Sequence, residues 1–278
     1  MKDLTASIVA YKNEASMIAH AIHSFLSATN DSKLFLIDNS PTDDLKYLAY
    51  DSRIVYIFND KNIGFGAAHN IALQKILYES KYHLVLNPDV YFDKGVIQQL
   101  YDFLEGDNTI GQVMPKVLSP AGHVQYLCKL LPSPQTLIVR RFLNFLTATL
   151  EKKNFSYELK FSDYDKVMDV PFLSGCFMFL RTDALRKVGL FDERFFLYTE
   201  DTDLTRRIHK HFRTVYFPDA KIFHHHARGS YKNLWLLWCN ICSAVKYFNK
   251  WGWFNDPERT SFNRRVLMNF SESRMISN

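Results

Sequence analysis

Short apolar runs alternate with longer amphipathic stretches along the first hundred residues of the chain. Four runs have the length and composition of buried strands, at residues 6–10, 34–37, 54–58 and 84–86. Between them, apolar residues recur every three or four positions, which predicts helices over residues 14–28 and 66–80. Strands that alternate with helices in this way build a mostly parallel sheet flanked by helices, so the pattern predicts an α/β fold.

The regular alternation ends after a further predicted helix over residues 94–106, for which Asp93 is the expected cap. Residues 115–170 hold four of the nine prolines and are therefore predicted to be an irregular insertion. Within this insertion, residues 136–150 form a candidate amphipathic helix. The charged segment 159–169 is expected to be mobile.

Two later apolar runs, at residues 171–181 and 220–223, predict strands that return to the core. No internal repeat or low-complexity tract divides the chain further. We therefore expect one α/β domain over residues 1–228, followed by a helical appendage rich in basic and aromatic residues over 229–278.

Polar residues follow each of the first four predicted strands, at residues 11–14, 38–39, 61–66 and 87–89. In open α/β sheets, ligands bind beyond the carboxyl ends of the strands. We therefore expect these four segments to line one cleft. Their convergence indicates a binding site more strongly than any single motif does.

Gly64-Phe65-Gly66 precedes the second predicted helix, where a dinucleotide-binding loop would lie. That pattern requires a third glycine at the position of His69, so the sequence does not support a dinucleotide fingerprint. The two glycines still allow backbone N–H groups to approach a ligand closely. The alternative is an ordinary connection between a loop and a helix.

Asn87-Pro88-Asp89 ends the fourth apolar run. The proline stiffens the turn, and a carboxylate at a strand end can hold Mg²⁺ or Mn²⁺ that is shared with a diphosphate. Asp89 is therefore a candidate metal ligand. The alternative is a simple turn stabilised by the aspartate itself.

Five acidic residues lie among aromatic residues in the segment FDERFFLYTEDTDLTRR, at residues 191–207. Buried carboxylates are costly unless they are paired or bind a metal. The cluster therefore indicates a general base, a divalent cation or both. The alternative is a solvated helix start, where the helix dipole favours acidic residues.

A helix that begins near Glu200 places Glu200 and Asp201 in its first turn, which makes them the candidates for chemistry. Asp203 is expected to pair with Arg206 or Arg207 at helical spacing. Because Asp201-Thr202-Asp203 also spells a metal-binding pattern, a metal role for these two carboxylates remains open.

Three consecutive histidines, His224, His225 and His226, follow the apolar run at 220–223. A single histidine is usually structural, but three beside predicted carboxylates favour one ligand for a metal or a phosphate. The sequence does not decide which of the three is the ligand. No zinc pattern accompanies them.

The net charge of +5 is unevenly distributed, because residues 206–278 hold 13 Lys and Arg against 4 Asp and Glu. Within this part, residues 231–254 mix tryptophans with lysines that include Lys246 and Lys250, which is typical of a segment that binds an anionic membrane surface. The alternative is a helix packed on the core or in a homodimer contact. The apolar run at 234–245 is too short to span a bilayer.

Composition narrows the class of protein further. With 47% hydrophobic and 23% charged residues, the chain is globular rather than disordered. The four cysteines lack the paired spacing of a metal site, and no signal peptide is visible at the N-terminus. We therefore expect reduced thiols in a cytoplasmic protein, and no nucleic-acid partner.

Seven features occur in order along residues 5–230: SIVAYKNE, IDNSPTDD, NDKNIGFGAAHN, NPDV, SGCFMFLR, GLFDERFFLYTEDTDLTRR and a strand-end histidine. In this order they resemble glycosyltransferase family 2. Within that family the chain is most similar to bacterial rhamnosyltransferases of surface polysaccharide synthesis. The likeness does not extend to residues 115–170 or to the C-terminal tail.

The resemblance implies a GT-A fold, in which a Rossmann-like sheet binds a nucleotide-diphosphate sugar together with Mg²⁺ or Mn²⁺. The implied donor-binding residues are Ala10, Tyr11, Glu14, Asp38, Asn62, Gly64, Gly66, Asn70 and Asn87. The implied metal ligands are Asp89 and His224. The implied catalytic residues are Asp201 and Glu200. The implied acceptor-side residues are Gly175 and Arg207. Asn87 stands where the full family motif has a first aspartate, which removes one negative charge from the metal site.

The resemblance therefore implies an inverting, metal-dependent transfer of L-rhamnose from dTDP-rhamnose to a saccharide or lipid-linked acceptor, with Asp201 as the base. One alternative within the family is transfer of a hexose or of galactofuranose from a UDP-sugar. A nucleotidyltransferase is disfavoured because residues 6–20 lack a glycine-rich loop, and a non-catalytic carbohydrate-binding module because Asp89 and Asp201 are both present. The expected location is the cytoplasm, at the inner face of the membrane if residues 231–254 bind lipid.

Overall fold

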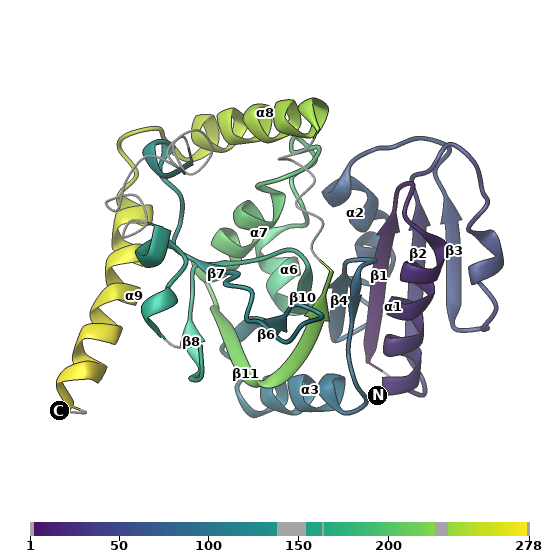
Figure 1. The fold of residues 1–278 in the computed structure, drawn as a ribbon, viewed down its shortest axis with the longest axis horizontal. Helices are drawn as coiled ribbons and strands as arrows, with labels where there is room; N and C mark the ends of the chain where they lie inside the picture. Colours follow the sequence, from purple (N-terminus) through teal and green to yellow (C-terminus); the bar gives the residue numbers. More distant parts are fainter. Residues whose placement is uncertain (1–2, 138–153, 163, 226–232, 277–278) are drawn as a thin grey trace.

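Four parallel strands form one half of the central sheet of the computed structural model, which describes residues 3–137, 154–162, 164–225 and 233–276 (Figure 1). They are β1 (Leu4–Ala10), β2 (Lys33–Asp38), β3 (Ile54–Phe58) and β4 (Tyr82–Leu86). β1 lies between β2 and β4 and is buried along its whole length. All four predicted strands are confirmed, with small shifts at their ends.

The other half of the sheet mixes strand directions. Its strands are β5 (Val90–Tyr91), β6 (Ile110–Leu118), β8 (Met168–Asp169), β10 (Phe177–Arg181) and β11 (Arg213–His224). β10 joins the two halves as an antiparallel strand between β4 and β6. The sheet therefore has nine strands in the order β3-β2-β1-β4-β10-β6-β11-β5, with β8 paired to β11 beside this path.

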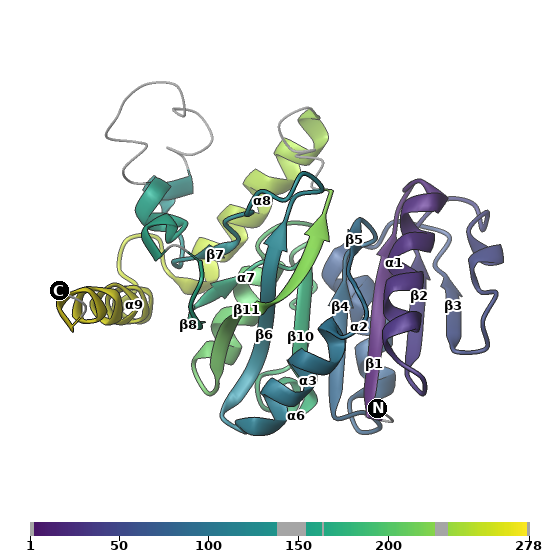
Figure 2. The same ribbon diagram turned by 60° about the horizontal axis from the view of Figure 1, so that its bottom comes forward.

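Helices cover both faces of this sheet (Figure 2). α1 (Ala15–Ala28) and α3 (Val96–Gly106) bury apolar residues on one face. α2 (Phe65–Ile76), α6 (Thr182–Val188) and α7 (Glu200–His209) do so on the other. The predicted α/β architecture, a mostly parallel sheet flanked by helices, is confirmed.

Smaller elements complete the fold. Two 3₁₀ helices, η1 (Lys46–Leu48) and η2 (Lys160–Ser162), lie in connections. β7 (Cys128–Lys129) and β9 (Phe172–Leu173) form a separate antiparallel pair. β7 belongs to the insertion, and β9 precedes the segment that contacts the catalytic candidates. This pair therefore joins the insertion to that segment.

The predicted cap of α3 is wrong. The helix begins at Val96 after Gly95, whose φ of 98° is a left-handed conformation that favours glycine. The backbone carbonyl of Asp93, and not its carboxylate, accepts the N–H of Val96 at 3.4 Å. A glycine turn therefore starts this helix without side-chain capping.

Parts of the segment 159–169 pack into the core, while Asp165, Lys166 and Val167 are exposed, and its mobility remains a prediction. Leu159 and Tyr164 are almost completely buried. The Tyr164 hydroxyl accepts the N–H of Cys128 and donates to the carbonyl of Glu158. These apolar and hydrogen-bonded contacts keep Leu159 and Tyr164 buried although charged residues lie in the same segment. The candidate helix at 136–150 lies outside the described residues except for its first two positions, which are helical.

Two C-terminal helices, α8 (Leu234–Trp251) and α9 (Pro257–Ile276), follow the α/β domain (Figure 1) and are joined to α7 by contacts of Arg206. The Arg206 guanidinium is 1% exposed, donates to both carboxylate oxygens of Asp256 at 2.6 and 2.8 Å, and stacks on Trp251 at 4.0 Å. The appendage is therefore joined to the helix that carries the catalytic candidates. Within the described ranges, no helix has the length and apolarity needed to cross a membrane.

Replacing Arg206 with methionine is expected to lower the free energy of unfolding by roughly 3 kcal/mol or more, because Asp256 would stay buried and lose the guanidinium that pairs with both of its carboxylate oxygens. Urea unfolding measures this loss. The control is Arg213→Met, which breaks the partly exposed pair between Arg213 and Asp107 and should cost about 1 kcal/mol or less. Equal losses in the two variants would contradict the proposed attachment.

Candidate active site

Three backbone contacts bring distant parts of the chain to one place. The N–H of Asn87 donates to the carbonyl that precedes β10 at 2.9 Å. The N–H of His225, just after β11, donates to the carbonyl of Asp89 at 3.1 Å. The N–H of Gly175 donates to the carboxylate of Asp201 at 2.8 Å. The predicted metal-side, acceptor-side and catalytic segments therefore lie side by side.

Asp89 and His224 form a close carboxylate–imidazole pair. The antiparallel pairing of β5 with β11 aligns Val90 with His224. Asp89 Oδ1 consequently lies 3.4 Å from His224 Nε2. His225 points elsewhere, with its ring 5.5 Å from that of Tyr91, and His226 lies outside the described residues.

The chemistry of this pair fits a divalent cation that is shared with a ligand. Across the described ranges, no group of three or more His, Cys, Asp or Glu side chains could hold a metal. Asp89 and His224 would thus supply two ligands at most. Mg²⁺ and similar cations are commonly held by one or two carboxylates, with substrate phosphates and water in the other positions.

The Asp201 carboxylate is held in place by two backbone N–H groups. Oδ2 accepts from Gly175 at 2.8 Å and Oδ1 accepts from Thr202 at 2.7 Å. A Cβ at position 175 would lie 2.9 Å from the Cβ of Asp201, so only glycine fits at this approach. The structure thus places Gly175, a predicted acceptor-side residue, directly against the candidate base.

Burial raises the pKa of both acids in the first turn of α7. The pKa of Asp201 is raised by desolvation, which the Gly175 hydrogen bond and the charge of Lys129 partly oppose. The pKa of Glu200 is raised well above its usual value by burial and then by the neighbouring Asp201. Glu200 Oε2 is buried without a hydrogen-bond partner among the described residues. A carboxylate with a raised pKa is a stronger base near neutral pH.

Lys129 is a residue of this site that the sequence analysis missed. It lies on β7, opposite Phe172 of β9, and its ammonium is 5.3 Å from the Phe172 ring. β9 runs directly into Ser174 and Gly175, which explains why the Lys129 charge acts on Asp201. No motif marks Lys129, because only the β7–β9 pairing brings it to the site.

Replacing Lys129 with glutamine is expected to raise the pKa of Asp201 further, because a positive charge that stabilises the carboxylate is lost. The acid limb of the kcat/KM profile, where activity falls as Asp201 is protonated, should therefore move to higher pH. The control Lys187→Gln changes an exposed lysine on α6 and should leave the profile in place. An unchanged acid limb in the Lys129 variant would show that this charge does not act on the base.

On the donor side, hydrogen bonds join the end of β2 to the glycine loop. Asn39 donates to the side chain of Asn62 and to the carbonyl of Gly64, both at 3.3 Å. Gly64 has a φ of 93°, and a Cβ there would lie 2.4 Å from the carbonyl oxygen of Phe196. Gly64 is therefore required for the close approach of this loop to the segment before α7.

The nucleoside-side candidates surround the same strand ends. Ala10 is buried and aligned with Asp38, whose carboxylate accepts from the Tyr56 hydroxyl at 2.8 Å. Tyr11 is 44% exposed beside this turn, and Glu14 is an exposed residue at the start of α1. At these strand ends, Tyr11 and Glu14 are thus exposed, while Asp38 is buried.

Asn70 and Gly66 of α2, which were predicted to bind the sugar donor, mainly contact the turn before α7. Asn70 binds the backbone of Phe191 through both ends of its amide, at 2.9 and 3.0 Å. A Cβ at Gly66 would lie 2.9 Å from the Phe191 side chain. The structure therefore places Asn70 and Gly66 in packing contacts, and their contact with a donor remains a prediction.

Asp203 pairs with Arg207 at 2.8 Å, which confirms the predicted pairing. Its fully buried carboxylate also accepts from Lys250 at 2.7 Å and from the Trp251 indole at 2.8 Å. Because donors occupy both of its oxygens, the structure favours the structural role of Asp203 over a metal role. Arg207 also binds backbone carbonyls of the turn that precedes Phe191, so an acceptor contact for it remains a prediction.

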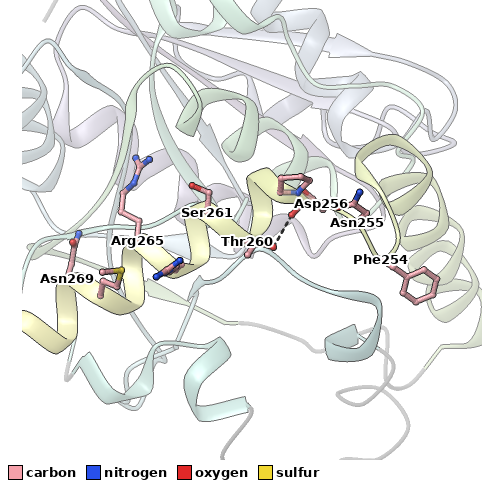
Figure 3. Close-up of a pocket in the computed structure, with 10 residues that line it drawn as sticks. Phe254, Asn255, Asp256, Thr260, Ser261, Arg265 and Asn269 are labelled. Carbon is pink, nitrogen blue, oxygen red and sulfur yellow. Dashed lines mark hydrogen bonds between the residues drawn. The ribbon is translucent and has the colours of Figure 1, made fainter.

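A hollow of about 670 Å³ lies along the start of α9 (Figure 3). Arg264, Arg265 and the outward-pointing Phe254 are among its lining residues. The hollow is lined by none of the predicted site residues. The candidate chemistry therefore lies at the strand ends and not in this hollow.

An α/β sheet whose strand ends carry acidic residues and a glycine loop is typical of proteins that act on nucleotide-containing ligands. The sequence profile of Glycosyl transferase family 2 matches residues 7–189, and that of Glycosyl transferase family group 2 matches residues 144–274. The expectation that the likeness excludes residues 115–170 and the C-terminal tail is therefore wrong. The chain belongs to glycosyl transferase family 2.

Two relatives narrow the comparison. Over 220 residues, the chain is 26% identical to N-acetylglucosaminyl-diphospho-decaprenol L-rhamnosyltransferase of Mycobacterium tuberculosis, covering 74% of this chain and 70% of the relative. Over 209 residues, it is 25% identical to the low-salt glycan biosynthesis hexosyltransferase Agl10 of Haloferax volcanii, covering 74% and 62%. The family and these relatives support a glycosyl-transferring enzyme near the rhamnosyltransferases.

Solved structures share the fold at 15% sequence identity. GalNAc-T7 with UDP, GalNAc and Mn²⁺ matches 80% of this chain with a TM-score of 0.60. Mannosyltransferase PcManGT from Pyrobaculum calidifontis, with GDP-Man and Mn²⁺, matches 82% with a TM-score of 0.57. The chain spans 42% and 58% of the length of these two structures. The expected GT-A fold is confirmed.

Proposed function

We propose that the protein transfers L-rhamnose from dTDP-rhamnose to a lipid-linked saccharide of surface polysaccharide synthesis, with inversion at the anomeric carbon. The mycobacterial relative supports the sugar and the type of acceptor, since it is named for L-rhamnose transfer to N-acetylglucosaminyl-diphospho-decaprenol. The observation that carries the proposal is the Asp201 carboxylate, which Gly175 holds at the site of the Asp89–His224 pair.

Asp201 is the proposed general base. The two N–H groups from Gly175 and Thr202 fix its carboxylate, and its raised pKa favours proton uptake from an acceptor hydroxyl. That hydroxyl attacks the anomeric carbon from the face opposite the nucleoside diphosphate, which leaves as the new bond forms. A single displacement of this kind inverts the anomeric carbon and needs no second carboxylate as nucleophile.

Asp89 and His224 are the proposed ligands of a divalent cation, Mg²⁺ or Mn²⁺. When bound, such a cation neutralises charge on the departing diphosphate. The solved structures with Mn²⁺ and a nucleotide or nucleotide sugar support a cation and a nucleotide-sugar donor in general. With Asn87 in place of a first aspartate, the site offers one carboxylate, so binding should depend strongly on the diphosphate oxygens.

A second candidate function is transfer of another sugar, such as a hexose or galactofuranose from a UDP-sugar, and the similarity to the archaeal hexosyltransferase favours it. The test is nucleotide release from a panel of dTDP-, UDP- and GDP-sugars, with N-acetylglucosamine linked through a diphosphate to a polyprenol as acceptor. Acceptor-dependent release from dTDP-rhamnose alone supports the proposal. If a different sugar nucleotide releases its nucleotide instead, the sugar of that nucleotide, and not rhamnose, is the one transferred.

We further propose that α8 binds the inner face of the cytoplasmic membrane, where a lipid-linked acceptor would lie. One face of α8 exposes apolar residues at helical spacing, namely Leu234, Trp238, Ile241 and Val245, and Trp235 adjoins them. The opposite face carries the buried residues that pack on the domain. A role of Lys250 in lipid binding is wrong, because its ammonium lies 2.7 Å from both Asp192 and Asp203.

Replacing Trp235 and Trp238 together with serine is expected to weaken binding to vesicles that contain one third phosphatidylglycerol by at least about tenfold, the equivalent of 1.4 kcal/mol. Co-sedimentation measures the binding. Tyr78→Ser removes an even more exposed aromatic ring after α2 and is the control. If neither the wild type nor the variant sediments and only the variant becomes monomeric on size exclusion, this face is a homodimer contact instead.

A further inference from the structure

The ring of His224 is held by Gln125, a residue that no motif marks. Gln125 Oε1 lies 2.9 Å from His224 Nδ1, and Gln125 Nε2 donates to the backbone carbonyl of His224 at 2.7 Å. One side chain therefore contacts the ring and the backbone of the same histidine.

The position of Gln125 follows from a tight turn at the end of β6. The N–H of Ser119 donates to the carbonyl of His123 at 2.7 Å, and the N–H of Gln125 donates to the carbonyl of Val117 at 2.8 Å. The chain thus folds back on β6, and β6 lies parallel to β11, which ends at His224. This first part of the insertion, whose role the sequence left open, reaches the candidate metal pair.

These contacts fix the tautomer of His224. The backbone carbonyl of His224 can only accept a hydrogen bond, so the NH₂ group of the Gln125 amide must face it. The amide oxygen then faces Nδ1, and because that oxygen can only accept, Nδ1 carries the proton. In the neutral ring, Nε2 therefore carries a lone pair and no proton, and this atom lies 3.4 Å from Asp89 Oδ1.

We infer that Gln125 is a positioning residue that presents the Nε2 lone pair of His224 to a divalent cation bound jointly with a nucleoside diphosphate. The inference rests on the proposed metal site of Asp89 and His224. Histidine ligands of metals are usually oriented by a hydrogen bond from the other ring nitrogen, and loss of such a partner typically weakens metal affinity 10- to 100-fold. Gln125 forms this bond here.

The first test measures Mn²⁺ binding with dTDP, and separately with UDP, from the loss of the free Mn²⁺ signal in electron paramagnetic resonance. Gln125→Leu should weaken Mn²⁺ binding about tenfold or more, because the acceptor at Nδ1 is lost. Gln125→Glu keeps an acceptor there and should restore most of the affinity. Gln98→Leu changes an exposed glutamine on α3 and should match the wild type.

The outcomes separate the inference from the metal site on which it rests. If the wild type binds Mn²⁺ and Gln125→Leu binds it equally well, the role of Gln125 is overturned while the metal site stands. If the wild type binds no Mn²⁺ with either nucleotide, the proposed metal site fails, and the inference fails with it.

A second measurement does not depend on the stability of a variant. Nitrogen-15 NMR of the metal-free wild type, with the His224 signals assigned through His224→Gln, reports which ring nitrogen carries the proton. At a pH where the ring is neutral, we expect the proton on Nδ1. A proton on Nε2 would overturn the inference even if Gln125→Leu did not fold.

Discussion

Asp201→Asn is expected to lower kcat by at least about a hundredfold, which is the lower end of the effect of a general base. Asparagine keeps the shape and can still accept the N–H of Gly175, but it cannot take a proton from the acceptor hydroxyl. Binding of the nucleoside diphosphate should be nearly unchanged, since the loss is one of chemistry and not of ground-state affinity. Steady-state kinetics and calorimetry with dTDP measure the two effects.

The matched control for this variant is Asp219→Asn, which removes an exposed carboxylate on β11, outside α7. This control should retain full turnover. If Asp201→Asn keeps more than half of the wild-type turnover, Asp201 is not the base. The buried Glu200 would then be the first residue to examine in its place.

Chelation is expected to lower transfer at least about a hundredfold, because several kcal/mol of charge stabilisation on the leaving diphosphate would be lost. Added Mg²⁺ or Mn²⁺ should restore activity. Asp89→Ala should weaken nucleoside-diphosphate binding strongly with the cation present and little without it. Asp93→Ala removes an exposed carboxylate four residues away that does not cap α3. It should leave nucleoside-diphosphate binding unchanged both with and without the cation.

Full activity in the presence of chelator would remove the role proposed for Asp89 and His224. A different outcome, in which Asp89→Ala weakens nucleotide binding equally with and without the cation, would indicate direct contact or local unfolding. A thermal unfolding curve of this variant separates the two explanations.

The sequence predicted the parallel half of the sheet because each of its strands is a local apolar run that a helix follows. β1, β2 and β4 are buried on both faces, so apolar composition alone indicates them. The antiparallel insertion of β10 between β4 and β6 was not predictable, since it depends on pairing between residues about ninety positions apart. The burial of Leu159 and Tyr164 within a charged segment was not predictable for a related reason.

The candidate site shows the same division between local and long-range information. Asp89 and Asp201 were indicated by strand-end position and acid clustering, and the β5–β11 pairing explains why His224 is the histidine beside Asp89. Lys129 and Gln125 carry no motif. The pairing of β7 with β9, which lies beyond the insertion, positions Lys129, and the turn after β6 positions Gln125. A single sequence therefore indicates the candidate catalytic and metal-binding residues. It does not as readily indicate the residues that orient those side chains or shift their pKa.

The C-terminal appendage combines the two alternatives that the sequence left open. One face of α8 packs on the domain through Ser243 and Tyr247, while Leu234 and Trp238 on the other face are exposed. The packing alternative therefore holds for one face, and lipid binding remains a proposal for the other. The buried Arg206–Asp256 pair joins this appendage to α7, so lipid contact at α8 would be close to the helix that carries Asp201.

The central claim is a single displacement of L-rhamnose in which Asp201 is the base. NMR spectroscopy of the isolated product, formed from dTDP-rhamnose and a diphosphate-linked N-acetylglucosamine acceptor, tests it most directly. The account predicts one new glycosidic bond whose anomeric configuration is opposite to that of the donor. A product with the donor's configuration would contradict it, because retention requires a covalent intermediate or another route that Asp201 acting as a base does not provide.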